Sequence, residues 1–132
     1  MLGGGPVCWQ SRKQKSVSTS TTEAEYVALS EASKQAIWVS RLLKELHAPE
    51  LISDNGILTL TNNQGALAIA KGDNSSKTKH IDVAYHFVRE CIFDGKIDVS
   101  YIPSNLMLAD ILTKPLPEQK AKSLINKIFQ LG

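Results

Sequence analysis

Residues 16–29 read SVSTSTTEAEYVAL, a hydroxyl-rich run that passes into a helix. Within it, Thr22 and Glu25 have the spacing of a capping box, in which each side chain accepts a hydrogen bond from the other residue's backbone N–H. A carboxylate in the first turn also suits the positive end of the helix dipole. A second interpretation stays open, in which Glu25 points into a metal-dependent active site.

The apolar pattern on both sides of this run predicts the other elements. Apolar residues recur at steps of three and four from Thr22 to about Leu46, which predicts one long helix, and Pro49 follows its end. The alternation of predicted strands and helices along the chain favours an α/β fold with at least partly parallel strands. The remaining predicted elements are strands at 7–14, 57–61 and 97–102, and helices at 64–71, about 80–94, 106–112 and 118–131.

Composition sets bounds on the class of protein. At 132 residues, with 42% hydrophobic and 21% charged residues, the chain is typical of one soluble globular domain. A net charge of +2 is too small to indicate nucleic-acid binding by itself. No apolar run approaches the ~20 residues of a membrane span, so no membrane partner is expected. Cys8 and Cys91 are predicted to be free, buried thiols, and an intracellular protein, cytoplasmic or nuclear, is expected.

Three polar positions lie where a site at the end of the sheet is expected. Glu25 opens the long helix, Asn62 ends the 57–61 strand and can cap the next helix, and Asp110 starts the last helical region. Carboxylates that converge from several segments hold the paired Mg²⁺ ions of two-metal nucleases, about 4 Å apart. This chain offers two carboxylates and one amide for such a site.

Four stretches carry a resemblance to a known family. They read WQSRKQ at 9–14, STTEAEYVAL at 20–29, TKHIDV at 78–83 with YHFVRE at 85–90, and ADILTKPL at 109–116. In this order and spacing they closely resemble the ribonuclease H domain at the end of copia-type retrotransposon polyproteins, over nearly the whole chain. The resemblance implies a ribonuclease H-like fold and cleavage of the RNA strand of an RNA/DNA hybrid by two Mg²⁺ ions held by four acidic residues.

The resemblance also assigns roles to single residues. Glu25 matches the family's helix-opening glutamate, Asp110 matches the last acidic residue, and Glu23 matches a residue outside the metal site. The third acidic position belongs to an Asp-Asn-Gln pattern that reads NNQ at 62–64 here, so Asn62 replaces the carboxylate. The first acidic position of the family lies on a strand that the family places before this chain begins. An amide brings no charge, so we expect weak or absent Mg²⁺ binding and loss of hydrolysis.

Residues 1–132 are therefore expected to form a single ribonuclease H-like domain that is incomplete at its N-terminus. The family's sheet has five strands, and without the first two about three remain, flanked by helices. The 57–61 strand then presents an open apolar edge, which invites a partner. Alternatives are direct pairing of the 7–14 strand with 57–61, a strand supplied by a second copy or another protein, and a marginally stable fold.

A basic cluster precedes and enters the helix at 80–94. Lys77, Lys79, His80 and Arg89 lie in a region that is a signature of the family, and contacts to nucleic-acid phosphates are one interpretation. A solvated helix face is an equal alternative. The rival to a defective nuclease is a non-catalytic module from a domesticated element, which binds nucleic acid or a protein. Three further predictions concern packing: Trp9 and Trp38 in the core, and Tyr85 with Phe87 against neighbouring helices.

Overall fold

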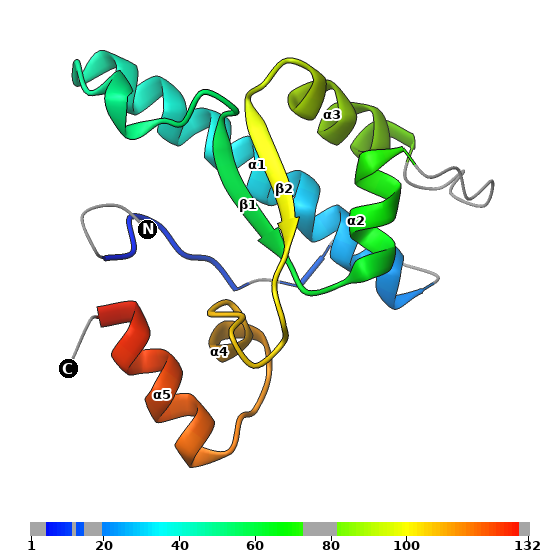
Figure 1. Ribbon diagram of the computed structural model, residues 1–132. Helices are drawn as coiled ribbons and strands as arrows, with labels where there is room; N and C mark the ends of the chain where they lie inside the picture. Colours follow the sequence, from blue (N-terminus) through cyan, green and yellow to red (C-terminus); the bar gives the residue numbers. More distant parts are fainter. Residues whose placement is uncertain (1–4, 12, 15–19, 73–81, 130–132) are drawn as a thin grey trace. The chain divides into compact units, whose positions relative to one another are not determined.

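The computed structural model of the chain describes residues 5–11, 13–14, 20–72 and 82–129. Residues 16–101 form one compact unit, and residues 1–15 with 102–132 form a second. Helices and strands alternate along the first unit, which confirms the α/β class (Figure 1). The elements in chain order are α1 (Thr21–Glu45), the 3-10 helix η1 (Pro49–Leu51), β1 (Ile57–Thr61), α2 (Gln64–Lys71), α3 (Asp82–Phe93), β2 (Ile97–Tyr101), α4 (Asp110–Thr113) and α5 (Glu118–Phe129).

The sheet of the first unit consists of β1 and β2, which run parallel. Ile57 pairs with Ile97 and Thr61 with Tyr101, so the two strands are in register over their whole length. Parallel strands need a long connection, and α2 and α3 provide it. The prediction of about three strands is wrong for the described residues, which form two.

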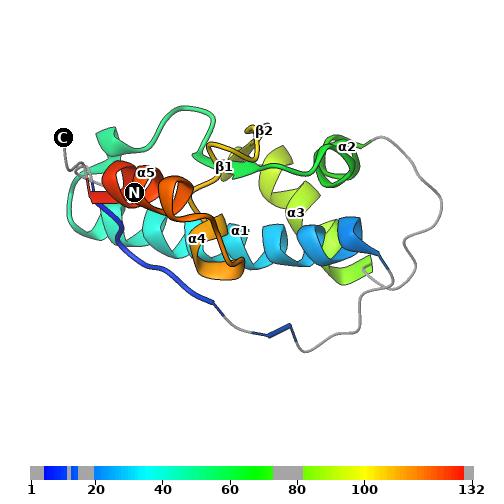
Figure 2. The same ribbon diagram turned by 90° about the horizontal axis from the view of Figure 1, so that it is seen from below.

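Two helices, α1 and α3, lie on the same side of the strands (Figure 2). The α1 helix ends where predicted, since His47 takes a positive φ of 55° and Pro49 begins η1. Gly95, with a φ of 65°, stops α3 in the same way. Between helices and strands lies the core, formed by Tyr26, Leu29, Ala36, Ala66, Ile69, Ala70, Val88, Cys91, Ile97 and Val99, with Tyr85 and Phe87 packed against it as predicted.

The two faces of β1 are filled in an unusual way. Thr59 and Thr61 are buried, whereas Leu58 and Leu60 are 58% and 42% exposed. On β2, Ile97 and Val99 are buried in the ordinary alternating pattern. Leu58 and Leu60 therefore point away from the core, while Thr59 and Thr61 point toward it on the same face as Ile57, which packs against the core.

The N-terminal segment differs from its prediction. Over residues 5–11 and 13–14, backbone pairing is limited to a bridge at Gly5, so the strand predicted at 7–14 is wrong there. Its polar side chains bond elsewhere: the Ser11 hydroxyl donates to the Leu112 carbonyl over 2.7 Å. An extended segment becomes a strand only when a neighbour takes up its backbone groups. Without one, Trp9 is 70% exposed rather than in the core.

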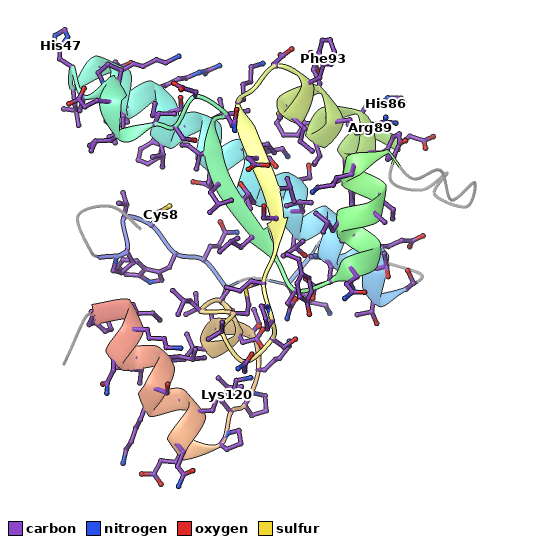
Figure 3. The ribbon with its side chains drawn as sticks, in the orientation of Figure 1. Cys8, His47, His86, Arg89, Phe93 and Lys120 are labelled. Atoms are coloured by element: carbon purple, nitrogen blue, oxygen red, sulfur yellow. The ribbon has the colours of Figure 1, made fainter. Side chains whose placement is uncertain are left out.

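Other predictions hold or fail according to burial. Trp38 is 51% exposed on α1, which contradicts its predicted place in the core. Both cysteines are free as predicted, but only Cys91 is buried, and Cys8 is exposed (Figure 3).

The helix predicted at 106–112 is confined to α4 and follows a series of turns. Within the part of the chain described, no helix is long and apolar enough to cross a membrane.

Candidate functional site

Glu25 lies in the second turn of α1 and is half-buried. The predicted capping box of Thr22 and Glu25 is wrong, because the N-cap is Ser20. Ser20 has the extended backbone that an N-cap needs, with φ −150° and ψ 162°, and its hydroxyl accepts from the Glu23 N–H over 3.2 Å. The helix begins one residue earlier than predicted, so the Glu25 carboxylate is not needed to cap it.

Asn62 follows the last residue of β1 and is also half-buried. The next residue caps α2: the Asn63 side-chain oxygen accepts from the Ala66 N–H over 2.8 Å. Asn63 is itself positioned by Thr61, whose hydroxyl oxygen accepts from the Asn63 N–H over 3.2 Å. The prediction that Asn62 caps the helix is therefore wrong by one residue.

The first turns of α1 and α2 lie against each other. A side-chain carbon placed at Gly65 would be 3.0 Å from Thr22 Cγ2 and 3.1 Å from its Oγ1. A side chain at position 65 would have to push the Thr22 side chain back by a few tenths of an ångström, so glycine suits this close approach of the two helices. This contact brings together the two segments that carry Glu25 and Asn62. That they form a site at the carboxyl ends of the strands stays a prediction.

Asp110 begins α4, as predicted, and is only 5% exposed. Its Oδ1 lies 3.0 Å from Lys114 Nζ, one turn further along the chain. Its Oδ2 lies 3.8 Å from Lys120 Nζ, which comes from α5. Each carboxylate oxygen therefore faces an ammonium group. The i, i+4 spacing of Asp110 and Lys114 is visible in the sequence, but no local pattern indicates Lys120.

The predicted ligands are divided between the two compact units. Glu25 and Asn62 belong to residues 16–101, and Asp110 belongs to the other unit. Across residues 5–11, 13–14, 20–72 and 82–129, no three histidine, cysteine, aspartate or glutamate side chains form a group that could hold a metal ion.

Of the predicted basic cluster, only Arg89 falls within the described residues; Lys77, Lys79 and His80 lie outside them. Arg89 is exposed on α3 near the end of α2 (Figure 3). Its guanidinium carbon lies 5.2 Å from the ring centre of Tyr85, and Nη1 donates to the Tyr85 hydroxyl. Nη2 would be 2.8 Å from a side-chain carbon at Gly72, whose φ of 98° ends α2. The two contacts with Tyr85 orient the guanidinium group, and the glycine at position 72 leaves space for it.

The contacts of Arg89 continue into the core through a second tyrosine. The fully buried Tyr26 donates its hydroxyl hydrogen to the Tyr85 carbonyl over 3.4 Å and so connects α1 with α3. Burial and the neighbouring Tyr85 raise the pKa of Tyr26 to about 12, against a smaller lowering by Arg89. Tyr26 is therefore neutral throughout the physiological range. Sequence reasoning missed this connection, although Tyr85 and Arg89 have i, i+4 spacing.

Three known proteins illustrate what the chain is similar to. It is 42% identical over 122 residues to the retrovirus-related Pol polyprotein from transposon TNT 1-94 of Nicotiana tabacum, which covers 90% of this chain and 9% of that protein. It is 36% identical over 133 residues to the retrovirus-related Pol polyprotein from transposon RE2 of Arabidopsis thaliana, and the match covers 96% of this chain and 9% of that protein. It is 32% identical over 129 residues to the transposon Ty1-DR1 Gag-Pol polyprotein of Saccharomyces cerevisiae, and the match covers 96% of this chain and 7% of that protein.

The chain thus spans less than a tenth of the length of these relatives. No family model matches the sequence, and no solved structure matches it. The similarity nevertheless covers at least nine-tenths of the chain in each of the three proteins. The chain is therefore homologous, over nearly its whole length, to one short segment of retrotransposon Pol polyproteins.

Proposed function

We propose that the chain is a ribonuclease H-like segment of a retrotransposon Pol polyprotein that has lost Mg²⁺-dependent cleavage of RNA in RNA/DNA hybrids. The observation that carries the proposal is the amide at position 62. Asn62 follows β1 directly, beside the point where α1 and α2 meet, and the family motif has a carboxylate there. The parallel sheet with helices and the homology to Pol polyproteins support the parent activity.

The available donors do not fit a pair of Mg²⁺ ions. Two hard divalent cations need many oxygen ligands and a large negative charge. Glu25 and Asp110 bring two charges and Asn62 brings none, while both oxygens of Asp110 already face lysines. In a partly buried site, Coulomb energies are large enough that each missing charge weakens cation binding strongly. These residues therefore support no catalytic step through paired metal ions.

The proposal is tested by incubating the 132-residue chain with Mg²⁺ and an RNA/DNA hybrid labelled on the RNA strand. We expect no more cleavage than with the Asp110→Asn variant, which serves as the blank for contaminating nucleases. An active ribonuclease H added to a parallel sample shows that the hybrid is intact and cleavable. Robust cleavage by the chain that disappears in Asp110→Asn contradicts the proposal.

A second candidate is a module that binds nucleic acid without cleaving it. The orientation of Arg89 favours it, because Tyr85 contacts the exposed guanidinium group on the helix that Lys77 and Lys79 precede in the sequence. Gel shifts with hybrid and with duplex DNA at increasing salt test this candidate. Binding should weaken with salt, and a Lys77→Gln/Lys79→Gln variant should lower the salt slope by about one for each phosphate that is no longer bound. Absence of binding at low salt contradicts it.

A further inference from the structure

Asp110 is a buried carboxylate with two lysines around it. Its side chain is 8% exposed, whereas those of Lys114 and Lys120 are 49% and 33% exposed. Lys114 approaches from the end of α4 and Lys120 from α5, each toward a different carboxylate oxygen. Lys120, labelled in Figure 3, also donates to the Ser104 carbonyl over 3.3 Å. The three charged residues and Ser104 all belong to the same compact unit.

The arrangement satisfies the needs of a buried charge. An ionised carboxylate in a protein interior is costly unless it is paired and hydrogen-bonded. Lys114 provides a hydrogen-bonded ion pair at 3.0 Å and Lys120 a longer ion pair at 3.8 Å, and together the three side chains carry one net positive charge. A divalent cation at Asp110 would have to displace both ammonium groups and would add to a charge that is already positive.

We infer that Asp110 works in this chain as the anionic centre of an ion triad with Lys114 and Lys120, which fastens α5 to α4. The position that the family resemblance assigns to a metal is thus occupied by the chain's own cations. The inference concerns the structural role of Asp110 and deepens the proposed function, on which it rests in part, because the two lysine contacts are also used there.

The same part of the chain contains a matched control pair. Lys122 and Glu118 on α5 have the same i, i+4 spacing and lie 2.6 Å apart, but both side chains are largely exposed. Exposed pairs contribute little to stability, whereas removing one partner of a buried pair leaves an unpaired buried charge. The contrast between the two pairs isolates the effect of the triad from that of helical lysines in general.

The first test measures amide hydrogen exchange along α5 in the full 132-residue chain. We expect the Lys120→Met and Lys114→Met variants to exchange roughly 10-fold faster or more, and Lys122→Met to change exchange by less than about twofold. Lys114→Arg keeps the charge and should stay near the wild-type rate. Equal effects of Lys120→Met and Lys122→Met, with α5 still folded, overturn the inference.

The second test asks whether a metal reaches Asp110. Paramagnetic Mn²⁺ is titrated into the ¹⁵N-labelled chain, and the broadening of amide signals at residues 109–112 is compared with the same signals in Asp110→Asn. Equal broadening in both proteins supports the triad. Stronger broadening in the wild-type chain overturns it. Neither test uses a nucleic-acid substrate, so this inference and the proposed function can fail separately.

Discussion

A side-chain carbon at Gly56 would lie 2.4 Å from the carbonyl carbon of Lys96, so the residue before β1 touches the residue before β2. The Ile57 N–H donates to the Lys96 carbonyl over 3.1 Å at the same point. This contact sets where the two strands begin to pair, and it requires that position 56 have no side chain.

Gly56→Ala should therefore lower the free energy of unfolding by about 3 kcal/mol or more, from a positive φ of 89° together with a clash against backbone atoms. Gly95→Ala is the control. Gly95 also has a positive φ, of 65°, but open space around it, so about 1 kcal/mol is expected there. Urea denaturation of both variants measures the difference, and equal losses would show that the contact at Gly56 is unimportant.

Because Tyr26 is buried, the free energy of unfolding should depend on pH in the alkaline range. Its pKa is about 12 in the folded chain and 10.0 without the surrounding structure, so folding favours the neutral phenol. Between these values the unfolded chain binds fewer protons, and stability is complete below pH 10 and falls as pH rises toward 12. The loss expected from Tyr26 is about 2–3 kcal/mol. Denaturation curves at several pH values measure it.

The variant Tyr26→Phe provides the matching control. The chain has 3 tyrosines, and in an ultraviolet titration of tyrosinate one should ionise only near pH 12. That late step should be absent in Tyr26→Phe, and the alkaline loss of stability should be smaller. Three tyrosines that ionise together in the native chain would contradict the prediction.

The assignment of Ser20 as the N-cap of α1 can be tested by mutation. Ser20→Ala removes the hydroxyl that accepts from the Glu23 N–H and should cost about 1 kcal/mol of unfolding free energy. Thr21→Ala, one residue later on an exposed part of the first turn, should change stability by less than about 0.5 kcal/mol. Thermal denaturation followed by circular dichroism compares them. A larger loss at Thr21 would refute the assignment of the cap.

The two cysteines should differ in reactivity. Cys8 is exposed, while Cys91 is buried and its thiol pKa is raised, first of all by that burial. Of the 2 thiols, only Cys8 should react with a thiol reagent in the native chain at neutral pH, and Cys91 should react only after unfolding. Mass spectrometry of the labelled peptides identifies the site, and rapid native labelling of Cys91 would contradict the prediction.

The parts of the fold that follow from local periodicity could be predicted from the sequence. The strand at 57–61 and the helix at 64–71 match β1 and α2, because their apolar spacing and flanking polar residues are contained within each segment. The strand at 7–14 could not be predicted correctly, since a strand depends on a neighbour far along the chain. The predicted N-caps, Thr22 and Asn62, differ from the observed ones, Ser20 and Asn63. Within each pair both side chains can accept the same hydrogen bond, and only the backbone angles decide which residue is the cap.

The positions of the three candidate residues along the helices and strands were predictable, because they follow from the same local patterns. The sequence places Glu25 near the start of α1, Asn62 after β1 and Asp110 at the start of α4, and the structure agrees. The lysine from α5 that faces Asp110 depends on packing between segments and has no local signal. Whether Glu25, Asn62 and Asp110 act together stays a prediction.

The inverted faces of β1 have a consequence for folding. A slip of the strand by one residue against β2 would bury Leu58 and Leu60, but it would expose Ile57 together with the two threonines, so the two registers compete in apolar burial. The close contact of Gly56 with Lys96 favours the native register at the start of the strand, and the Asn63 cap begins α2 directly after its end. The strand is locally frustrated, and loosening either end should populate misregistered chains before it unfolds the helices.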